Sequence, residues 1–98
     1  MKTVEEIKAV LRAEQGELHR RFHVRRIGIF GSHARGQATP VSDVDILVDL
    51  DQPVGWEIVD LHSHLEMILE AKVDLVTQRA VMRKPLLWRS IEENLVYV

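Results

Sequence analysis

Two aspartates, Asp43 and Asp45, open the segment S-D-V-D-I-L-V-D-L, in which apolar residues alternate with other residues. Residues two apart on a β-strand project from the same face, about 6.6 Å apart along it. Two carboxylates at that distance repel each other by roughly 2–3 kcal/mol at an effective dielectric constant near 20. A divalent cation reverses this cost, and Mg²⁺ typically takes one or two carboxylates together with substrate phosphates. The pair therefore predicts a magnesium site, although two solvent-facing acids at the start of a strand would look the same.

A second group of residues, Gly31, Ser32 and Arg35, has the chemistry to bind phosphate. The apolar run at 27–30 predicts a strand that turns into a short helix at Gly31, where backbone N–H groups are unpaired and directed outward. Glycine lets a phosphate approach the backbone closely, and a serine hydroxyl adds a donor. Arg35 can form a bidentate contact with phosphate oxygens. Each residue alone would be ordinary, as a turn glycine or a solvated arginine, but together they predict a phosphate pocket facing the metal site.

Asp74 is the third piece of the predicted site. It stands in the apolar run V-D-L-V at 73–76, which predicts a neighbouring strand. A carboxylate in an apolar run is costly unless it is paired, hydrogen-bonded or bound to a metal. Asp74 is therefore interpreted as a third metal ligand near Asp45 or as the base that accepts a proton from an incoming hydroxyl group. An edge-strand aspartate pointing to water is the competing interpretation.

The elements that must position these residues follow from hydrophobic periodicity. Helical spacing predicts helices over about 4–21, with Gly16 as a weak point, over 58–69, and from Pro85 onward. A tight turn opening a short helix is predicted at 32–36. Predicted strands cover about 27–30, 43–50 and 73–77, with a small terminal strand at 96–98. This order of elements predicts an α/β or α+β fold in which helices pack on one sheet.

Composition limits the classes of protein to which the chain could belong. Its 98 residues suffice for one domain, predicted to span 1–98, and 46% of them are apolar. The absence of cysteine excludes disulfides and thiol catalysis. No apolar stretch approaches the roughly 20 residues of a membrane-spanning helix, and the N-terminus resembles no signal peptide. The expected location is the cytoplasm, without membrane association, and a domain this small commonly relies on a partner or larger assembly.

One basic run has no place in the predicted site. It consists of Arg20, Arg21, Arg25 and Arg26. Such a run could contact RNA or an acidic partner, but a solvated face is the more common explanation. The formal net charge of −2 argues against general attraction to nucleic acid.

Three segments of the chain resemble the minimal nucleotidyltransferase group of the DNA polymerase β-like superfamily. They are G-S-H-A-R-G at 31–36, S-D-V-D-I-L-V at 42–48 and V-D-L-V at 73–76. The pattern of that group is G-S-x-x-R-G, a short spacer, S-D-x-D followed by an apolar strand, and a later acid. The match spans nearly the whole chain in the same order and spacing. The resemblance implies the nucleotidyltransferase fold, a small mixed β-sheet flanked by helices that has a nucleotide-binding site.

The resemblance also implies a role for individual residues. ATP is the implied substrate, and the nucleotide-binding positions are Gly31, Ser32 and Arg35, although the role of the arginine is less sharply defined in the group. Magnesium is the implied cofactor, and the catalytic and metal-binding positions are Asp43, Asp45 and Asp74. His33 falls at a variable position of the motif and receives no role.

Proteins of this group look like partners of a small helical HEPN-type toxin. The similar proteins act as antitoxins, and some transfer AMP from ATP to a tyrosine of the toxin. The resemblance therefore implies a magnesium-dependent protein adenylyltransferase that works in a hetero-complex or oligomer. A non-catalytic antitoxin that blocks its partner by binding, or a nucleotide sensor, is the alternative. The complete set of acids favours the enzyme, because blocking alone does not need it. Nucleic acid is not an expected substrate, since so small a chain has no obvious module for gripping a primer.

Overall fold

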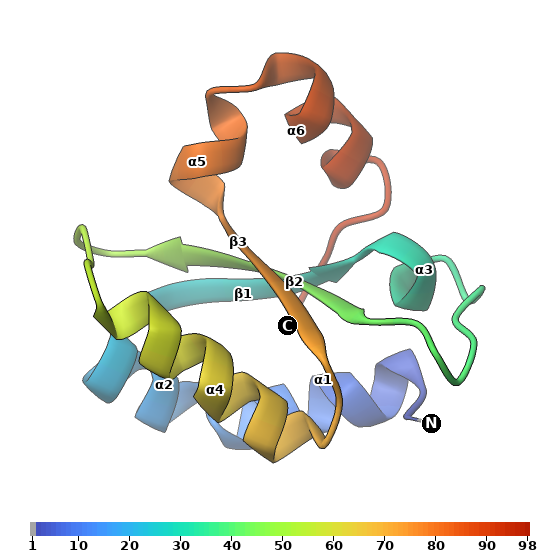
Figure 1. Cartoon of the computed structure of the whole chain (residues 1–98), viewed down its shortest axis with the longest axis horizontal. Coiled ribbons are helices and arrows are strands. Elements are labelled where there is room, and N and C mark those ends of the chain that lie inside the picture. Colours follow the sequence, from blue (N-terminus) through green and yellow to red (C-terminus); the bar gives the residue numbers. More distant parts are fainter. Residues whose placement is uncertain (1) are drawn as a thin grey trace.

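A four-stranded sheet lies at the centre of the computed structural model, which describes residues 2–98 (Figure 1). Helices pack on both of its faces. The elements in chain order are α1 (Val4–Ala13), α2 (Gln15–Phe22), β1 (Val24–Phe30), α3 (Gly31–Ala34), β2 (Val44–Leu50), α4 (Glu57–Leu69), β3 (Val73–Thr77), α5 (Gln78–Met82), α6 (Pro85–Glu92) and β4 (Val96–Tyr97).

The sheet is mixed, with the strand order β3-β2-β1-β4. Strand β1 is antiparallel to both β2 and β4, whereas β2 and β3 are parallel. Parallel neighbours need a crossover connection, and α4 supplies it between β2 and β3. A small mixed sheet flanked by helices is the fold class predicted from the sequence, and the structure confirms it.

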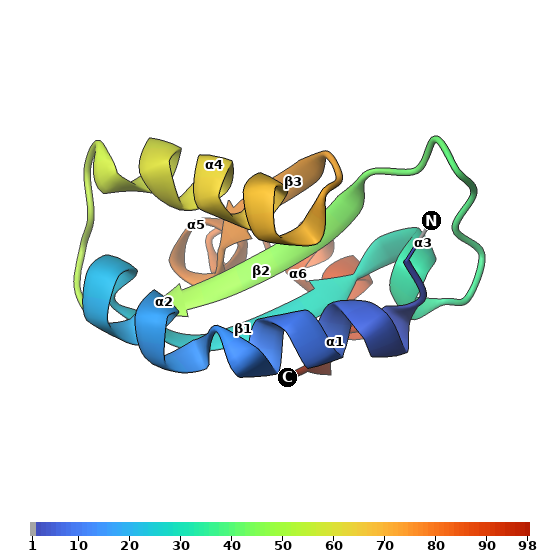
Figure 2. The ribbon, with the colours of Figure 1, turned by 90° about the horizontal axis from the view of Figure 1, so that it is seen from below.

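The alternation along β2 divides the apolar residues between two cores. Val44, Ile46 and Val48 belong to the larger core, on the face covered by α1, α2 and α4 (Figure 2). Leu47 points to the opposite, second face and packs with Val81 of α5, Ile91 of α6 and partly buried apolar residues of α6 and the strands. Because side chains alternate along a strand, Asp45 and Asp49 share this second face with Leu47.

The N-terminal helix begins as predicted but is not continuous. Thr3 and Glu6 form a capping box at its start. The helix is interrupted at Glu14, whose backbone has φ −97° and ψ 0°, so α1 and α2 are separate helices. The predicted weak point at Gly16 is wrong by two residues, since Gly16 lies within α2. Glu14 instead receives a hydrogen bond from Nε2 of His64 on α4, at 3.0 Å.

Within residues 2–98, no helix combines the length and the apolar character that crossing a bilayer requires.

Candidate active site

The turn between β1 and α3 brings the backbone of Gly31 against the side chain of Asp45. Gly31 has a φ of +70°, in the left-handed region that residues with a Cβ atom rarely adopt. A Cβ atom added at position 31 would lie only 2.8 Å from Cγ of Asp45 and 3.2 Å from its Cβ. The turn predicted to bind phosphate and a carboxylate predicted to bind metal are therefore direct neighbours, and only glycine fits between them.

Strand register places the three predicted acids at one end of the sheet. Asp45 on the central strand β2 pairs with Phe30, the last residue of β1, and with Asp74 on β3. Asp43 lies two residues before Asp45, at the exposed entry to β2. Asp74 is exposed on an edge strand, as the competing interpretation of the sequence expected, but it also lies beside Asp45. The fold thus brings together acids that are about 30 residues apart in the sequence.

The surroundings of Asp45 favour its protonated form. Burial, the charges of Asp74 and Asp43, and a hydrogen bond with Asp74 together raise the pKa of its carboxyl group to about 6. The guanidinium group of Arg35 opposes these effects. A cluster of carboxylates with so little compensating positive charge is costly in the absence of a cation. The site therefore has the electrostatic character of a cation-binding site.

The three acids suit a magnesium ion that is also coordinated by water and phosphate, rather than a metal coordinated by protein side chains alone. Within residues 2–98, no set of three histidine or acidic side chains is gathered closely enough to hold a metal alone. Magnesium usually keeps open coordination positions for water and substrate phosphates, and it needs only one or two carboxylates. Asp45 and its neighbours Asp43 and Asp74 could supply those carboxylates, and the Gly31 turn lies where phosphates would complete the coordination.

Ser32 and Arg35 lie at opposite ends of α3. Ser32 is in the first turn of this four-residue helix, which has no side-chain cap at its N-terminus. Its hydroxyl and backbone N–H groups are therefore donors for an anion. Arg35 is the C-cap residue and is exposed, and its Nε donates to Oε1 of Gln37 at 3.2 Å. Its charge reaches Asp45, since it opposes the increase in the pKa of that carboxyl group.

His33 is buried, which the sequence analysis did not anticipate. It is only 5% exposed, and its Nδ1 has no hydrogen-bond partner among the described residues. It borders a cavity of about 650 Å³ that is also lined by Ser42 and Asp43. A histidine in a polar turn motif is usually solvated, so nothing in the local sequence indicated its burial beneath the loop that leads to Asp43.

The raised pKa of Asp45 predicts how stability depends on pH without metal. Its folded-state pKa of about 6 exceeds the reference value of 3.8, so its contribution to stability is present below about pH 4 and is lost as pH rises through 6. In EDTA, Asp45→Asn should therefore unfold a few degrees higher than the wild type at pH 8, since 1 kcal/mol shifts the Tm of such a domain by about 4–8 °C.

Thermal unfolding followed by circular dichroism measures this difference, which should shrink toward zero near pH 4. Asp60→Asn, at an exposed position on α4, is the control and should show no such pH-dependent gain. An equal or lower Tm for Asp45→Asn at pH 8 would mean that Asp45 is not under electrostatic strain.

Comparison with known proteins gives consistent results. A family model described as a nucleotidyltransferase domain matches residues 7–98. The protein adenylyltransferase MntA of Thermococcus cleftensis is 42% identical over 99 residues, covering 100% of this chain and 98% of the relative. A protein from Methanocaldococcus jannaschii, named as a candidate protein adenylyltransferase, is also 42% identical, over 100% of both chains.

Solved structures show the same fold. A protein described as a minimal nucleotidyltransferase superposes with a TM-score of 0.75 at 28% identity, covering 97% of this chain and 95% of the other. A toxin–antitoxin complex solved with AMP-PNP contains a chain that superposes with a TM-score of 0.68 at 24% identity, covering 93% and 68%. With the family model and the relatives matched over their full length, these findings show that the chain belongs to the nucleotidyltransferase family of enzymes.

Proposed function

We propose that this chain transfers AMP from ATP to a hydroxyl side chain of a small helical HEPN-type protein and acts as its antitoxin. The observation that carries the proposal is the contact between the Gly31 turn and Asp45, with Asp74 in register beside it. An anion-binding turn packed against a cluster of carboxylates suits a metal-bound polyphosphate, because the cation links two groups that would otherwise repel each other. A fold used only for binding would not need this arrangement.

The relatives support the choice of AMP as the transferred group and of a protein as the acceptor. The full-length relative from Thermococcus cleftensis is named a protein adenylyltransferase. One chain of similar fold comes from a complex described as a tri-AMPylated HEPN toxin of Shewanella oneidensis with an MNT antitoxin. Its 19% identity supports likeness of fold alone, so the acceptor of the present chain is inferred from the family and the site.

Each residue of the site has a defined task in this proposal. Asp43 and Asp45 would hold Mg²⁺, and Asp74 beside them would act as the base. When bound, magnesium neutralises phosphate charge and stabilises the charge that develops on the transferring and leaving groups. The Gly31 turn binds the phosphates that leave, through backbone N–H groups and the hydroxyl of Ser32.

The transfer itself is an in-line displacement at the α-phosphorus of ATP. The oxygen of the acceptor hydroxyl forms a bond to that phosphorus as the bond to the bridging oxygen of the β-phosphate breaks, and pyrophosphate leaves. Asp74 lies on the edge strand, where an acceptor can approach from solvent, and it takes the proton of the hydroxyl group. Arg35 would contact phosphate oxygens as their charge is redistributed.

Isotope labelling tests the reaction. The chain is mixed with Mg²⁺, the protein encoded by the neighbouring gene, and ATP labelled at either the α- or the γ-phosphate. We expect stable label on the neighbour from α-labelled ATP only, with release of pyrophosphate. Removing Mg²⁺ with EDTA should abolish the labelling.

The other outcomes identify the alternatives. Label from γ-labelled ATP would indicate a kinase. A tight complex of the two proteins with neither label would indicate an antitoxin that blocks by binding, and the catalytic proposal would then be wrong.

A further inference from the structure

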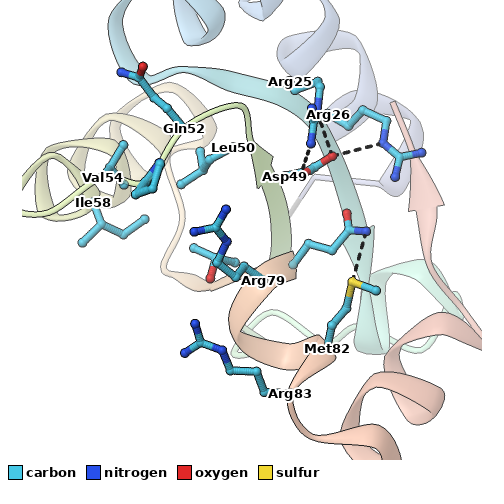
Figure 3. Close-up of a pocket in the computed structure, with 13 residues that line it drawn as sticks. Arg25, Arg26, Asp49, Leu50, Gln52, Val54, Ile58, Arg79, Met82 and Arg83 are labelled. Carbon is cyan, nitrogen blue, oxygen red and sulfur yellow. Dashed lines mark hydrogen bonds and ion pairs between the residues drawn. The ribbon is translucent and has the colours of Figure 1, made fainter.

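A groove lined by four arginines opens beside Asp49 (Figure 3). Its volume is about 1060 Å³. It lies at the far end of β2, between the start of β1, the loop leading to α4, and helix α5. Arg25 and Arg26 come from β1, and Arg79 and Arg83 come from α5 and its C-cap. We call this feature the arginine groove.

One carboxylate, that of Asp49, lies close to two of the four arginines. Asp49 accepts two hydrogen bonds from Arg25, from Nε and Nη2, each 3.1 Å long. Its carboxylate is also 3.7 Å from Nε of Arg26, whose guanidinium group stacks over the ring of Tyr97 at 4.3 Å. Among the described residues that line the groove, Asp49 is the only acid. It orients Arg25 and Arg26 but neutralises only one of them, so the pair keeps an excess of positive charge.

The two arginines of α5 have no such partner. Within residues 2–98, no carboxylate lies within 4.0 Å of Arg79 or Arg83, and both side chains are exposed. They are four residues apart, which places them on the same side of the helical turn. Guanidinium groups bind carboxylates through two parallel hydrogen bonds, so two unpaired arginines at this spacing suit an acidic ligand.

The remaining walls of the groove suit a polypeptide. Apolar side chains line it, among them Leu50 of β2, Ile58 of α4 and Met82 of α5, and Met82 is 52% exposed. Acidic and apolar side chains on one segment would therefore match the groove.

The groove and the acidic site lie at opposite ends of β2. Asp49 follows Asp45 by four residues on β2, which corresponds to about 13 Å along the strand. Both side chains project from the face on which α5 and α6 pack. Leu47, between the two positions, is buried under α5 and α6, so a docked segment must pass around these helices and needs more than the four extended residues that a straight path would take. A ligand seated in the arginine groove could place residues further along its chain at the acidic site.

Nucleic acid fits the groove less well than protein does. Proteins that bind single strands stack bases on aromatic side chains, and none of the residues lining this groove is aromatic. The net charge of the chain is −2, whereas nucleic-acid-binding domains are generally basic. The charge in the groove is local, which favours a ligand with a few carboxylates over a continuous polyanion.

We infer that the arginine groove docks an acidic segment of the acceptor protein and so brings the acceptor hydroxyl to Asp43, Asp45 and Asp74. Only the delivery of the acceptor hydroxyl rests on the proposed AMP transfer, since the docking itself needs no nucleotide. Binding energy gained away from the reacting atoms positions the acceptor and raises the rate of transfer at low acceptor concentration. Complementary charge also speeds encounter and selects the partner.

The test uses the full chain with a charge reversal at Arg79→Glu or Arg83→Glu. Arg12→Glu is the matched control, because Arg12 is an exposed arginine on α1, which packs on the opposite face of the sheet. Two probes are measured without nucleotide: the protein encoded by the neighbouring gene and fluorescein-labelled poly-L-glutamate. Each groove variant should bind both probes roughly tenfold more weakly, as expected for losing a charged contact, whereas Arg12→Glu should match the wild type.

A second set of measurements separates docking from catalysis. In AMP transfer, the groove variants should raise KM for the acceptor roughly tenfold, with kcat and the Kd for Mg–ATP within about twofold of wild type. If the wild type transfers no AMP but the groove variants still weaken binding, the proposed reaction fails and the docking inference stands. The docking inference would be wrong if the groove variants bound the probes with wild-type affinity and had the wild-type KM for the acceptor. It would also be wrong if the wild type failed to bind the neighbour.

Discussion

Replacing Asp45 with asparagine is expected to reduce AMP transfer by roughly 1,000-fold or more. Asp45 is the half-buried acid at the centre of the site, between the Gly31 turn and Asp74. A metal ion stabilises the transition state of such a reaction by several kcal/mol, and each 1.36 kcal/mol corresponds to a factor of ten in rate. Asparagine keeps the shape of the side chain but loses the charge that holds the cation. Label transfer from α-labelled ATP measures the effect, and calorimetry should show that magnesium-dependent ATP binding is also lost.

The control for this variant must remove a carboxylate without touching the site. Asp60→Asn meets that condition, since Asp60 is exposed on α4, on the other side of the sheet. It should retain transfer within about twofold of wild type, because surface substitutions of this kind usually change stability by less than 0.5 kcal/mol. Near-normal transfer by folded Asp45→Asn would show that the metal and the reaction lie elsewhere.

The combination of a rate loss with a gain in stability would be informative. Without metal, Asp45→Asn removes a group whose ionisation above pH 6 opposes folding. A purely structural aspartate would behave in the opposite way, since its removal would cost stability. Functional sites commonly contain such locally unfavourable arrangements, which persist because the rest of the fold compensates for them.

Local pattern was sufficient to predict the strand that displays the acids. The alternation of β2 indicated that Asp45 and Leu47 share one face and Ile46 the other, and the two cores confirm this. Hydrophobic periodicity does not show which strands pair with each other or in what register. That Asp74 lies beside Asp45 depends on parallel register between β2 and β3, which α4 and its packing determine. The apolar run around Asp74 suggested a place for this acid near Asp45, and the pairing of β2 with β3 confirms that the two residues are neighbours.

The arginine groove shows where the sequence analysis was incomplete. Arg25 and Arg26 were grouped with Arg20 and Arg21 because they are near in sequence, yet Arg20 pairs with Glu17 on α2, at 3.0 Å. An irregularity in the pairing of β1 with β2 lies between positions 24 and 26, where the chain passes from α2 into the sheet. Neighbours in the sequence thus diverge to different faces of the molecule.

Helix α5 was missed for a related reason. Its five residues are too few to show helical periodicity, so the arginines that it presents had no predicted element. One local signal was available, because the Thr77 side chain caps the helix by accepting from the backbone N–H of Ala80, at 3.3 Å. Placing Arg79 and Arg83 opposite β1 still required the packing of Val81 on Leu47 in the second core.

Gly31→Ala is expected to abolish magnesium-dependent ATP binding, with a loss in affinity of roughly 100-fold or more, and to reduce AMP transfer accordingly. The added methyl group would occupy the space of the Asp45 carboxylate, so that side chain must swing away from the turn. Losing a metal–phosphate site of this kind costs several kcal/mol, and 1.4 kcal/mol corresponds to a factor of ten in affinity. The positive φ adds a smaller penalty, of roughly 1–2 kcal/mol, that acts on folding.

Gly36→Ala separates these two effects. Gly36 has nearly the same backbone conformation, with φ +71°, but a Cβ atom there would meet nothing within 4 Å. It should therefore lose about 1–2 kcal/mol of unfolding free energy from strain alone and keep its affinity for Mg–ATP. If both variants bound Mg–ATP equally, or if Gly31→Ala lost only stability, the close approach of turn and carboxylate would have no part in nucleotide binding. If only Gly31→Ala lost Mg–ATP binding, the close approach of turn and carboxylate would be required for nucleotide binding, because only at position 31 does the methyl group displace a carboxylate.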